Sequence, residues 1–169
     1  MTAIARLTRE LLDFKYTKCH TRKNVLQPGD KSYDGFVLGY VWSWAHTKTV
    51  EEPGGCFRLS LTTQNPRFNT IYELAKDIGD DFGAEFSTIQ FNKNYMCKKH
   101  IDGKNMGISH IIGLGNYTGG ELLIYYDGPD KDPTSVDIKN RFYSFDGASY
   151  FHETAPFQGE RHTLVYFIL

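Results

Sequence analysis

The sequence of 169 residues has few cysteines and no long apolar run. Its three cysteines, Cys19, Cys56 and Cys97, are odd in number and widely spaced, which favours reduced thiols over a disulfide framework. The longest apolar runs are far shorter than the roughly 20 residues that a membrane-spanning helix needs. Arg6 and Arg9 interrupt the first residues, where a secretory signal would be uncharged. We therefore expect an intracellular protein with no membrane partner, nuclear in a eukaryote or cytoplasmic in a prokaryote or virus.

A strong excess of charge of either sign is also missing. The formal net charge is −1, although basic residues outnumber acidic ones within residues 1–50. A protein that contacts many phosphates usually carries a much stronger positive stripe, so charge alone does not indicate nucleic acid. Repeats and low-complexity tracts are absent, and hydrophobic residues make up 40% of the chain. This composition excludes disordered, collagen-like and repeat proteins, and it indicates one globular domain over residues 1–169.

Two amphipathic helices are predicted within residues 1–84, which we expect to support the rest of the fold. Apolar residues recur at helical spacing over 4–14. A clearer helix begins with Thr70 and Glu73, which form a capping-box pattern, and it ends near Gly83. Between the two helices, residues 15–35 are predicted as a loop, and residues 36–44 and 58–63 are predicted as strands.

From residue 85 onward the pattern changes to short strands separated by Gly, Asn, Asp and Pro. Such dense, regularly punctuated strands indicate an antiparallel sandwich or barrel, here with the two helices on the outside of one sheet. The predicted fold class is therefore α+β and mainly β, with its core in residues 85–169. The strands are expected at 85–92, 97–102, 107–114, 121–126, 141–145, 149–152 and 162–169.

Two histidines and one carboxylate in this half of the chain are candidate metal ligands. On a strand, His100 and Asp102 would project from the same face, because they are two residues apart. Alone, this triplet arises easily by chance, but His152 ends a later predicted strand. Two histidines and one carboxylate form the ligand set that holds Fe(II) on one face and leaves its other positions open.

An arginine in the last predicted strand is a candidate carboxylate anchor. Arg161 lies in an otherwise apolar segment, where a buried guanidinium without an anion is costly. Thr163 follows two residues later on the same strand face. Together, the two side chains could hold a small carboxylate through a forked ion pair and a hydroxyl hydrogen bond.

The order His100-x-Asp102, His152 and Arg161-x-Thr163 resembles the double-stranded β-helix dioxygenases that use Fe(II) and 2-oxoglutarate. The resemblance covers roughly residues 85–169. The wider segments NKNYMCKKHIDGKN, GLGNYTGGEL, FDG and HETAPFQGER are similar to the TET/JBP group. Members of that group oxidise the methyl group of 5-methylcytosine or thymine in nucleic acid.

The resemblance implies a double-stranded β-helix core of the jelly-roll or cupin type, with flanking N-terminal helices. It also implies that Fe(II), 2-oxoglutarate and O2 are used together, and that DNA with a modified pyrimidine is the partner. The implied iron ligands are His100, Asp102 and His152. The implied contacts to the distal carboxylate of 2-oxoglutarate are Arg161 and Thr163, and further candidate hydrogen-bond partners for this cosubstrate are Asn92 and Asn94.

Several assignments stay open at this point. His110 could approach the cofactor or be an interior residue, whereas His162 should point away from Arg161 and be structural. The alternating aromatics Tyr40, Trp42 and Trp44 could stack on bases or belong to the core. A basic loop could meet phosphates or be a wet surface; its residues are Lys15, Lys18, Arg22 and Lys23. The alternative functions are a hydroxylase of a protein side chain such as proline or of a small molecule, and a non-catalytic β-barrel binding module.

Overall fold

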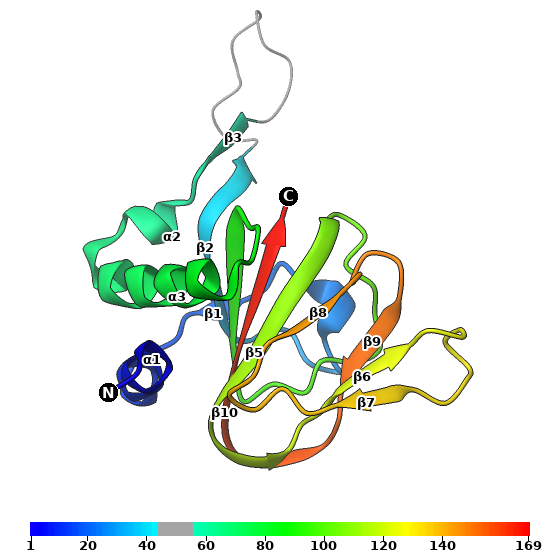
Figure 1. Cartoon of the computed structure of the whole chain (residues 1–169). Coiled ribbons are helices and arrows are strands. Elements are labelled where there is room, and N and C mark those ends of the chain that lie inside the picture. The colour runs from blue at the N-terminus through cyan, green and yellow to red at the C-terminus, as the bar shows by residue number, and fades with distance from the viewer. Residues whose placement is uncertain (44–55) are drawn as a thin grey trace, which may run out of the picture.

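The computed structural model describes residues 1–43 and 56–169. These residues form two antiparallel sheets and several helices (Figure 1). The helices are α1 (Ala3–Leu12), α2 (Leu61–Gln64) and α3 (Asn69–Phe82), with 3-10 turns at Lys23–Val25 and Pro66–Phe68. The strands are β1 (Lys18–Cys19), β2 (Tyr33–Ser43), β3 (Cys56–Leu59), β4 (Thr88–Lys93), β5 (Met106–Gly119), β6 (Leu122–Tyr125), β7 (Thr134–Val136), β8 (Tyr143–Phe145), β9 (Phe151–Thr154) and β10 (Phe157–Ile168).

The larger sheet has the strand order β1-β2-β4-β10-β5-β8, with β3 paired to the far end of β2. Strand β10 lies near its middle, because it pairs with β4 on one side and with β5 on the other. The register places Thr163 opposite Asn92 and Arg161 opposite Gly115. The last strand of the chain is thus held on both sides, which fixes where its polar side chains point.

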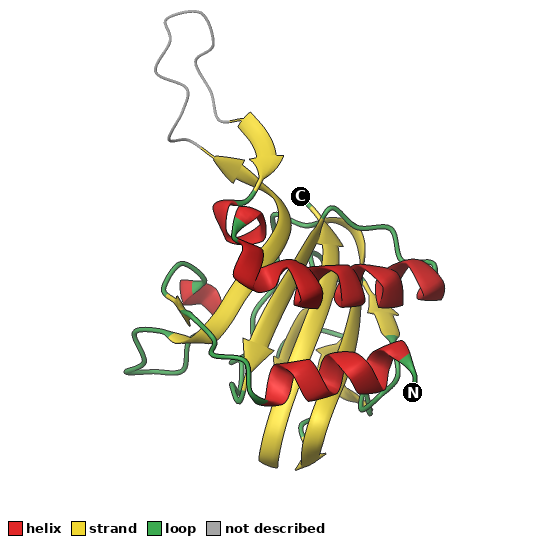
Figure 2. Cartoon of the chain, turned by 90° about the vertical axis from the view of Figure 1, so that its left-hand side faces the viewer, coloured by secondary structure: helices red, strands yellow, loops and turns green. Residues whose placement is uncertain are grey.

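Helices α1 and α3 lie side by side across one face of the larger sheet (Figure 2). The apolar stripe predicted for the second helix is buried there, from Ile71 to Ile78, although Phe82 at its end is 45% exposed. Gly83 ends α3 in a left-handed conformation with φ of 81°, as a helix C-terminus prefers. No described helix combines the length and apolar character that a membrane crossing needs.

The smaller sheet, in the order β7-β6-β9, packs against the other face of the larger sheet. Ile111 of β5 and Val165 of β10 meet Leu122 and Ile124 of β6 in an apolar cluster. Neighbouring residues of β5 therefore serve different layers, since Ile112 belongs to the core under the helices. The mainly β class, the two facing sheets and the helices outside one sheet were all predicted, and the structure confirms them.

Several local predictions were wrong. Strand β3 ends at Leu59, and Ser60 caps α2 by accepting a hydrogen bond from the Thr63 amide, so 58–63 is not one strand. Helix α3 lacks the predicted capping box, because the 3-10 turn that precedes it runs directly into the helix. The capping side chain lies upstream instead, where Asn65 Oδ1 accepts from the Arg67 amide. The predicted loop 15–35 contains β1, a 3-10 turn and the start of β2.

The chain around the predicted metal ligands also differs from the expectation. Residues 97–102 form no regular strand, and only an isolated bridge joins His100 to His152. Strand β7 was not predicted, because the turn-rich sequence around Thr134–Val136 hides three extended residues that pair with β6. Strand β2, from the half of the chain expected to be a support, is a full member of the larger sheet beside β4.

Candidate metal and carboxylate site

His100, Asp102 and His152 converge between the two sheets. Each of the three side chains offers one ligand atom, and these three atoms lie within 4.8 Å of one another. His100 and His152 exchange both of their backbone hydrogen bonds, at 3.0 and 2.9 Å, although 52 positions separate them in the sequence. Asp102 is fixed by its own amide, which donates to the Gly147 carbonyl at 2.8 Å. The predicted triad is therefore assembled by the backbone rather than by one continuous strand.

The hydrogen bonds of the two imidazoles determine which ring nitrogen faces the site. Nδ1 of His100 lies 2.7 Å from the Lys98 carbonyl, and Nδ1 of His152 lies 2.9 Å from the Tyr150 carbonyl. A carbonyl only accepts, so each Nδ1 carries the proton and each Nε2 presents a lone pair. Both Nε2 atoms approach the Asp102 carboxylate, at 3.6 and 3.5 Å. Protein metal sites commonly orient their histidines in this way.

The electrostatics of the triad favour the protonation states that bind a metal. Burial and the neighbouring His152 lower the pKa of His100 to about 4, so that its imidazole is neutral near pH 7. Burial alone would raise the pKa of Asp102, but the neighbouring His152 and the Arg22 charge bring it below its usual range. One carboxylate and two imidazoles are the donor set that suits Fe(II) with open coordination positions.

Arg161 lies deeper in the same narrow cavity, buried to 3% exposure. Its Nη2 donates to the Gly120 carbonyl at 2.8 Å, while its Nε has no partner. Within the described parts of the chain, no carboxylate forms an ion pair with it, and burial lowers its pKa. Gly120 is required here, because a Cβ at this position would lie 2.7 Å from the Arg161 Nε. The cavity thus holds a buried cation that lacks an anion.

Asn92 and Thr163 lie beside this guanidinium, on adjacent strands. Asn92 Nδ2 donates to Thr163 Oγ1 at 3.0 Å, and Asn92 Oδ1 has no partner. Asn94 has another place, since its Oδ1 accepts from the Arg161 amide at 2.8 Å and it does not line the cavity. Asn94 adopts φ of 49°, and its backbone N–H donates to the Arg161 carbonyl. Asn94 therefore holds the Arg161 backbone. Of the two asparagines considered as cosubstrate contacts, only Asn92 lines the cavity.

The residues of this cavity fit both an iron ion and 2-oxoglutarate. Three donors converge in it, and the unpaired guanidinium and the Thr163 hydroxyl line the same cavity. A carboxylate bound there would supply the anion that Arg161 lacks. Apolar side chains from both sheets complete the walls and exclude water: Ile111, Leu122, Phe145 and Val165.

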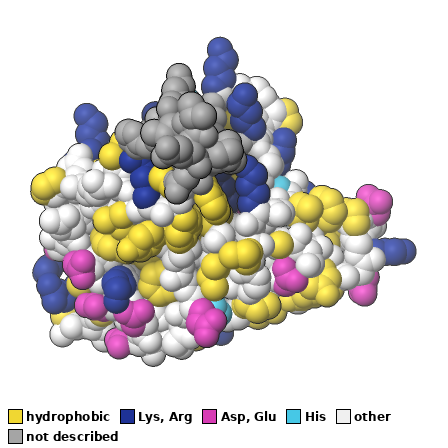
Figure 3. All heavy atoms as spheres, turned by 90° about the horizontal axis from the view of Figure 1, so that it is seen from above, with side chains coloured by type: hydrophobic (Ala, Val, Ile, Leu, Met, Phe, Trp, Pro, Cys, Tyr) yellow, Lys and Arg dark blue, Asp and Glu magenta, His cyan; other side chains and the backbone are white. Residues whose placement is uncertain are grey.

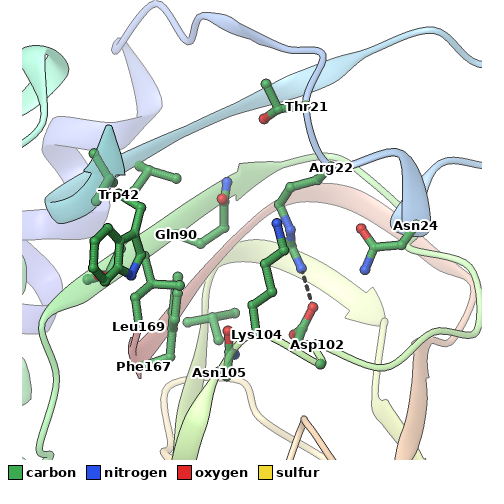
Figure 4. A pocket seen from close by; sticks show the side chains of 15 residues that line it. Thr21, Arg22, Asn24, Trp42, Gln90, Asp102, Lys104, Asn105, Phe167 and Leu169 are labelled. Carbon is green, nitrogen blue, oxygen red and sulfur yellow. Dashed lines mark hydrogen bonds and ion pairs between the residues drawn. The ribbon is translucent and has the colours of Figure 1, made fainter. Parts of the chain in front are cut away.

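A second, larger cavity of about 870 Å³ opens beside the first, and the two share Arg22, Asp102 and Val165 (Figure 4). Figure 4 shows Trp42, Phe167 and Leu169 on one side of it and Lys104 and Asp102 on the other. Its volume falls within the usual range for small-ligand pockets, about 300–1,000 Å³. Spacing in the sequence indicated none of these residues except Trp42 and Asp102, because the larger cavity exists only where distant strand ends meet.

The other residues considered from the sequence have mixed outcomes. His110, for which both an approach to the cofactor and an interior place were considered, lies away from the triad, where its Nδ1 is 2.7 Å from Ser144 Oγ and its ring packs near Phe82. His162 points away from Arg161, as predicted, and its Nδ1 is 3.0 Å from the Tyr16 hydroxyl.

Of the alternating aromatic residues in the first third, those that the structure describes do not belong to the core, and two of the four basic residues form ion pairs. Tyr40 and Trp42 are 45% and 53% exposed, and Trp44 lies outside the described residues. Lys18 forms an ion pair with Asp34 at 2.7 Å. Arg22 is bound to Asp102, so it is not an open phosphate contact, and no sequence signal identified its partner.

Comparison with known proteins supports the fold. A scan against protein-family models finds no match, and a search of curated proteins finds none either. Among solved structures, the chain is similar to an oxidoreductase of the 2OG-Fe(II) oxygenase family from Burkholderia pseudomallei. The TM-score is 0.59 at 20% identity, over 96% of this chain and 76% of the other.

Two further structures show the same likeness. NgTET1 in complex with 5mC DNA has a TM-score of 0.58 at 17% identity, over 98% of this chain and 67% of that one. OsALKBH1 has a TM-score of 0.50 at 10% identity, over 99% of this chain and 91% of that one. The predicted double-stranded β-helix fold is thereby confirmed.

Proposed function

We propose that this protein is a 2-oxoglutarate-dependent dioxygenase that uses Fe(II) and O2. The observation that carries the proposal is the position of two features in one cavity, namely the His100, Asp102 and His152 donors and the unpaired buried guanidinium of Arg161. A metal site alone would not require such an arginine. An anion-binding arginine alone would not require three converging metal donors.

Each residue has a defined task in this proposal. His100 Nε2, His152 Nε2 and an Asp102 oxygen would hold the iron, while Arg161 and the Thr163 hydroxyl bind the distal carboxylate of 2-oxoglutarate. When bound, iron and 2-oxoglutarate supply the chemistry that places one atom of O2 in the substrate C–H bond and the other in succinate, with release of CO2. The protein orients these groups and shields them from water.

Thr163 donates its proton to the carboxylate because Asn92 already occupies a lone pair of the hydroxyl oxygen. The hydroxyl hydrogen is then directed away from Asn92 and toward the cavity. Arg161 cannot give up its proton at any working pH, so its charge persists even though burial lowers its pKa. The anchor is therefore a permanent cation with an oriented hydroxyl beside it.

We further propose that the substrate is the methyl group of a 5-methylpyrimidine in DNA. The larger cavity adjoins Asp102 and offers the Trp42 indole and the Phe167 ring together with Gln90 and Asn105, which suit a planar base with a polar edge. Lys104 adds a cation at its wall. Figure 3 looks down on the end of the molecule at which β2 and β3 pair. It shows further Lys and Arg side chains gathered on one side of that end. The likeness to NgTET1, which was solved with 5mC DNA, supports the same substrate class.

A hydroxylase of a protein side chain or a small molecule is the second candidate. The near-neutral net charge of −1 favours it, since DNA-binding proteins usually carry an excess of positive charge. The larger cavity is also wide enough for a proline-bearing loop or a free metabolite. The two candidates share the iron and 2-oxoglutarate site and differ only in what enters the larger cavity.

One experiment separates these functions. The protein is loaded with Fe(II) and supplied with 2-oxoglutarate, ascorbate and air. It then receives 5-methylcytosine DNA, unmethylated DNA or a peptide library. Mass spectrometry follows succinate and the oxidised nucleoside or residue, with His100→Ala as the inactive control. Oxidised 5-methylcytosine or thymine supports the DNA proposal, whereas oxidation confined to peptides supports the second candidate. Failure to retain iron and to form succinate would instead indicate a non-catalytic binding module.

A further inference from the structure

Arg22 contacts a predicted metal ligand although it comes from the other end of the chain. Its Nη2 donates to Asp102 Oδ1 at 2.8 Å, and the two side chains are only 23% and 12% exposed. In the part of the chain that the structure describes, Arg22 is the only lysine or arginine paired with this carboxylate. It also lines both cavities, so it stands where they meet.

We infer that Arg22 is a positioning residue that holds the Asp102 carboxylate ready for the metal ion. This inference rests on the proposed metal site but not on any particular substrate. Arg22 binds Oδ1, which also lies 3.6 Å from His100 Nε2, while Oδ2 lies 3.5 Å from His152 Nε2. The guanidinium therefore fixes the carboxylate through Oδ1, with Oδ1 facing one imidazole and Oδ2 facing the other.

The backbone around Arg22 is braced against the segment that carries the ligands. Asn24 Nδ2 donates to the Ile101 carbonyl at 3.2 Å, and Gln27 Nε2 donates to the Met96 carbonyl at 2.8 Å. The Lys98 amide donates to the Val25 carbonyl at 3.0 Å. Three contacts thus tie residues 24–27 to residues 96–101, immediately beside Arg22. A guanidinium on such a support loses little freedom when it binds a carboxylate.

The physical reason for the arrangement is that, among the described residues, Arg22 is the one donor hydrogen-bonded to the Asp102 side chain. The two imidazoles cannot replace it, because their Nε2 atoms face the site as lone pairs. A carboxylate that is free to rotate presents its oxygen less often and costs ordering entropy when the ion binds. The positive charge of Arg22 opposes the incoming cation, so a positioning role requires that the orientation it imposes on the carboxylate outweighs that repulsion. Outer-shell partners of this kind typically change metal affinity by about 10–100-fold.

The test measures metal binding rather than turnover. Purified wild type, Arg22→Ala, Arg22→Gln and Lys23→Ala are freed of metal and titrated with Co(II) by calorimetry and by visible absorption. Lys23 is the matched control, because it is the adjacent exposed cation and makes no side-chain ion pair in the described structure. We expect Arg22→Ala to weaken Co(II) binding about 10–100-fold and to change the Co(II) spectrum, with Lys23→Ala unchanged. Arg22→Gln keeps a planar donor and should recover part of the affinity.

Each result has a distinct meaning. If wild type binds no Co(II), the proposed metal site itself fails. If wild type binds Co(II) and Arg22→Ala binds it equally well, only the positioning role is overturned. A higher 2-oxoglutarate requirement with unchanged Co(II) binding would also overturn it, because Arg22 would then be a cosubstrate contact. Thermal unfolding without metal shows whether Arg22→Ala is folded, and if it is not, Arg22→Gln decides the outcome.

Discussion

Asn92 donates its carboxamide to the Thr163 hydroxyl at 3.0 Å, across the paired strands β4 and β10. The bond leaves the Thr163 proton free for a carboxylate and leaves Asn92 Oδ1 without a partner. In the proposed function, Asn92 would therefore act on the anchor of 2-oxoglutarate through its neighbour Thr163, and this effect can be measured.

Asn92→Ala should raise the KM for 2-oxoglutarate by about 2–12-fold, the range expected for a hydrogen bond worth 0.5–1.5 kcal/mol. Thr163→Val should do the same, because it removes the hydroxyl that Asn92 orients. The double variant should be little worse than either single one, since the residues act as a unit. Initial rates of succinate formation give the three values. Fully additive effects would show that Asn92 and Thr163 act independently.

Arg161→Ala should raise the 2-oxoglutarate requirement by at least about 30-fold, since loss of a buried charged partner costs about 2–5 kcal/mol. The metal-free protein should be no less stable than wild type, because an unpaired buried cation is removed. Thermal unfolding and saturation with 2-oxoglutarate check the two parts. Arg161→Lys keeps the charge and should recover only part of the binding, because it lacks the forked geometry. Unchanged saturation in Arg161→Ala would place the carboxylate anchor elsewhere.

His100→Ala should abolish iron retention and turnover, because one of three donors is lost. Its unfolding temperature in EDTA should be close to that of wild type, since the imidazole lines a cavity rather than filling the apolar core. Metal content by plasma emission and circular dichroism report the two quantities. His110→Ala is the matched control, because His110 lies on the far side of the larger sheet. The His110→Ala protein should retain iron. Wild-type iron content in His100→Ala would contradict the assignment of this ligand.

His162 should make the metal-free protein less stable in mild acid. Burial and the nearby Lys93 lower its pKa to about 4, although Glu160 acts in the opposite direction, and the Tyr16 hydroxyl contacts its other nitrogen. The unfolded chain therefore binds a proton that the folded chain refuses, so stability is full above pH 6.5 and declines as pH falls toward 4. Between pH 7 and pH 5 we expect a loss of about 1–2 kcal/mol from this residue.

Urea unfolding in EDTA at several pH values measures the loss assigned to His162. His162→Gln should flatten the dependence relative to wild type, while the contributions of the other histidines stay in both proteins. Equal slopes for the two proteins would show that His162 does not govern this stability.

Trp42→Ala should weaken DNA turnover with little effect on the fold, since the indole is 53% exposed and lines the larger cavity. The expected rise in KM for methylated DNA is about 5–150-fold, from the 1–3 kcal/mol that stacking of a base contributes. The KM for 2-oxoglutarate should not move. Leu61→Ala is the control, because Leu61 is 66% exposed and lines neither cavity. Equal kinetics in wild type and Trp42→Ala would remove Trp42 from the substrate site.

Residue type and spacing alone were sufficient to predict much of this protein. The alternation of short strands and turns indicated the sheets, and the helical spacing of Ile71 to Ile78 indicated the face that α3 buries. His100, Asp102 and His152 could be recognised because few donor sets suit a metal, and Arg161 because a cation in an apolar strand needs an anion. Metal-binding ability and charge are properties of the side chains themselves, so the sequence is sufficient to identify them.

Only the tertiary structure could decide which distant residues meet. Arg22 was predicted as surface and lies on Asp102, 80 positions away, because the loop after β1 folds back along residues 96–101. Asn92 and Asn94 looked alike in sequence, yet one faces the cavity and the other holds the Arg161 backbone, since Asn94 lies just beyond the end of β4 with a positive φ. Pairing across strands and the walls of a cavity are long-range relations, and no local pattern of residues encodes them.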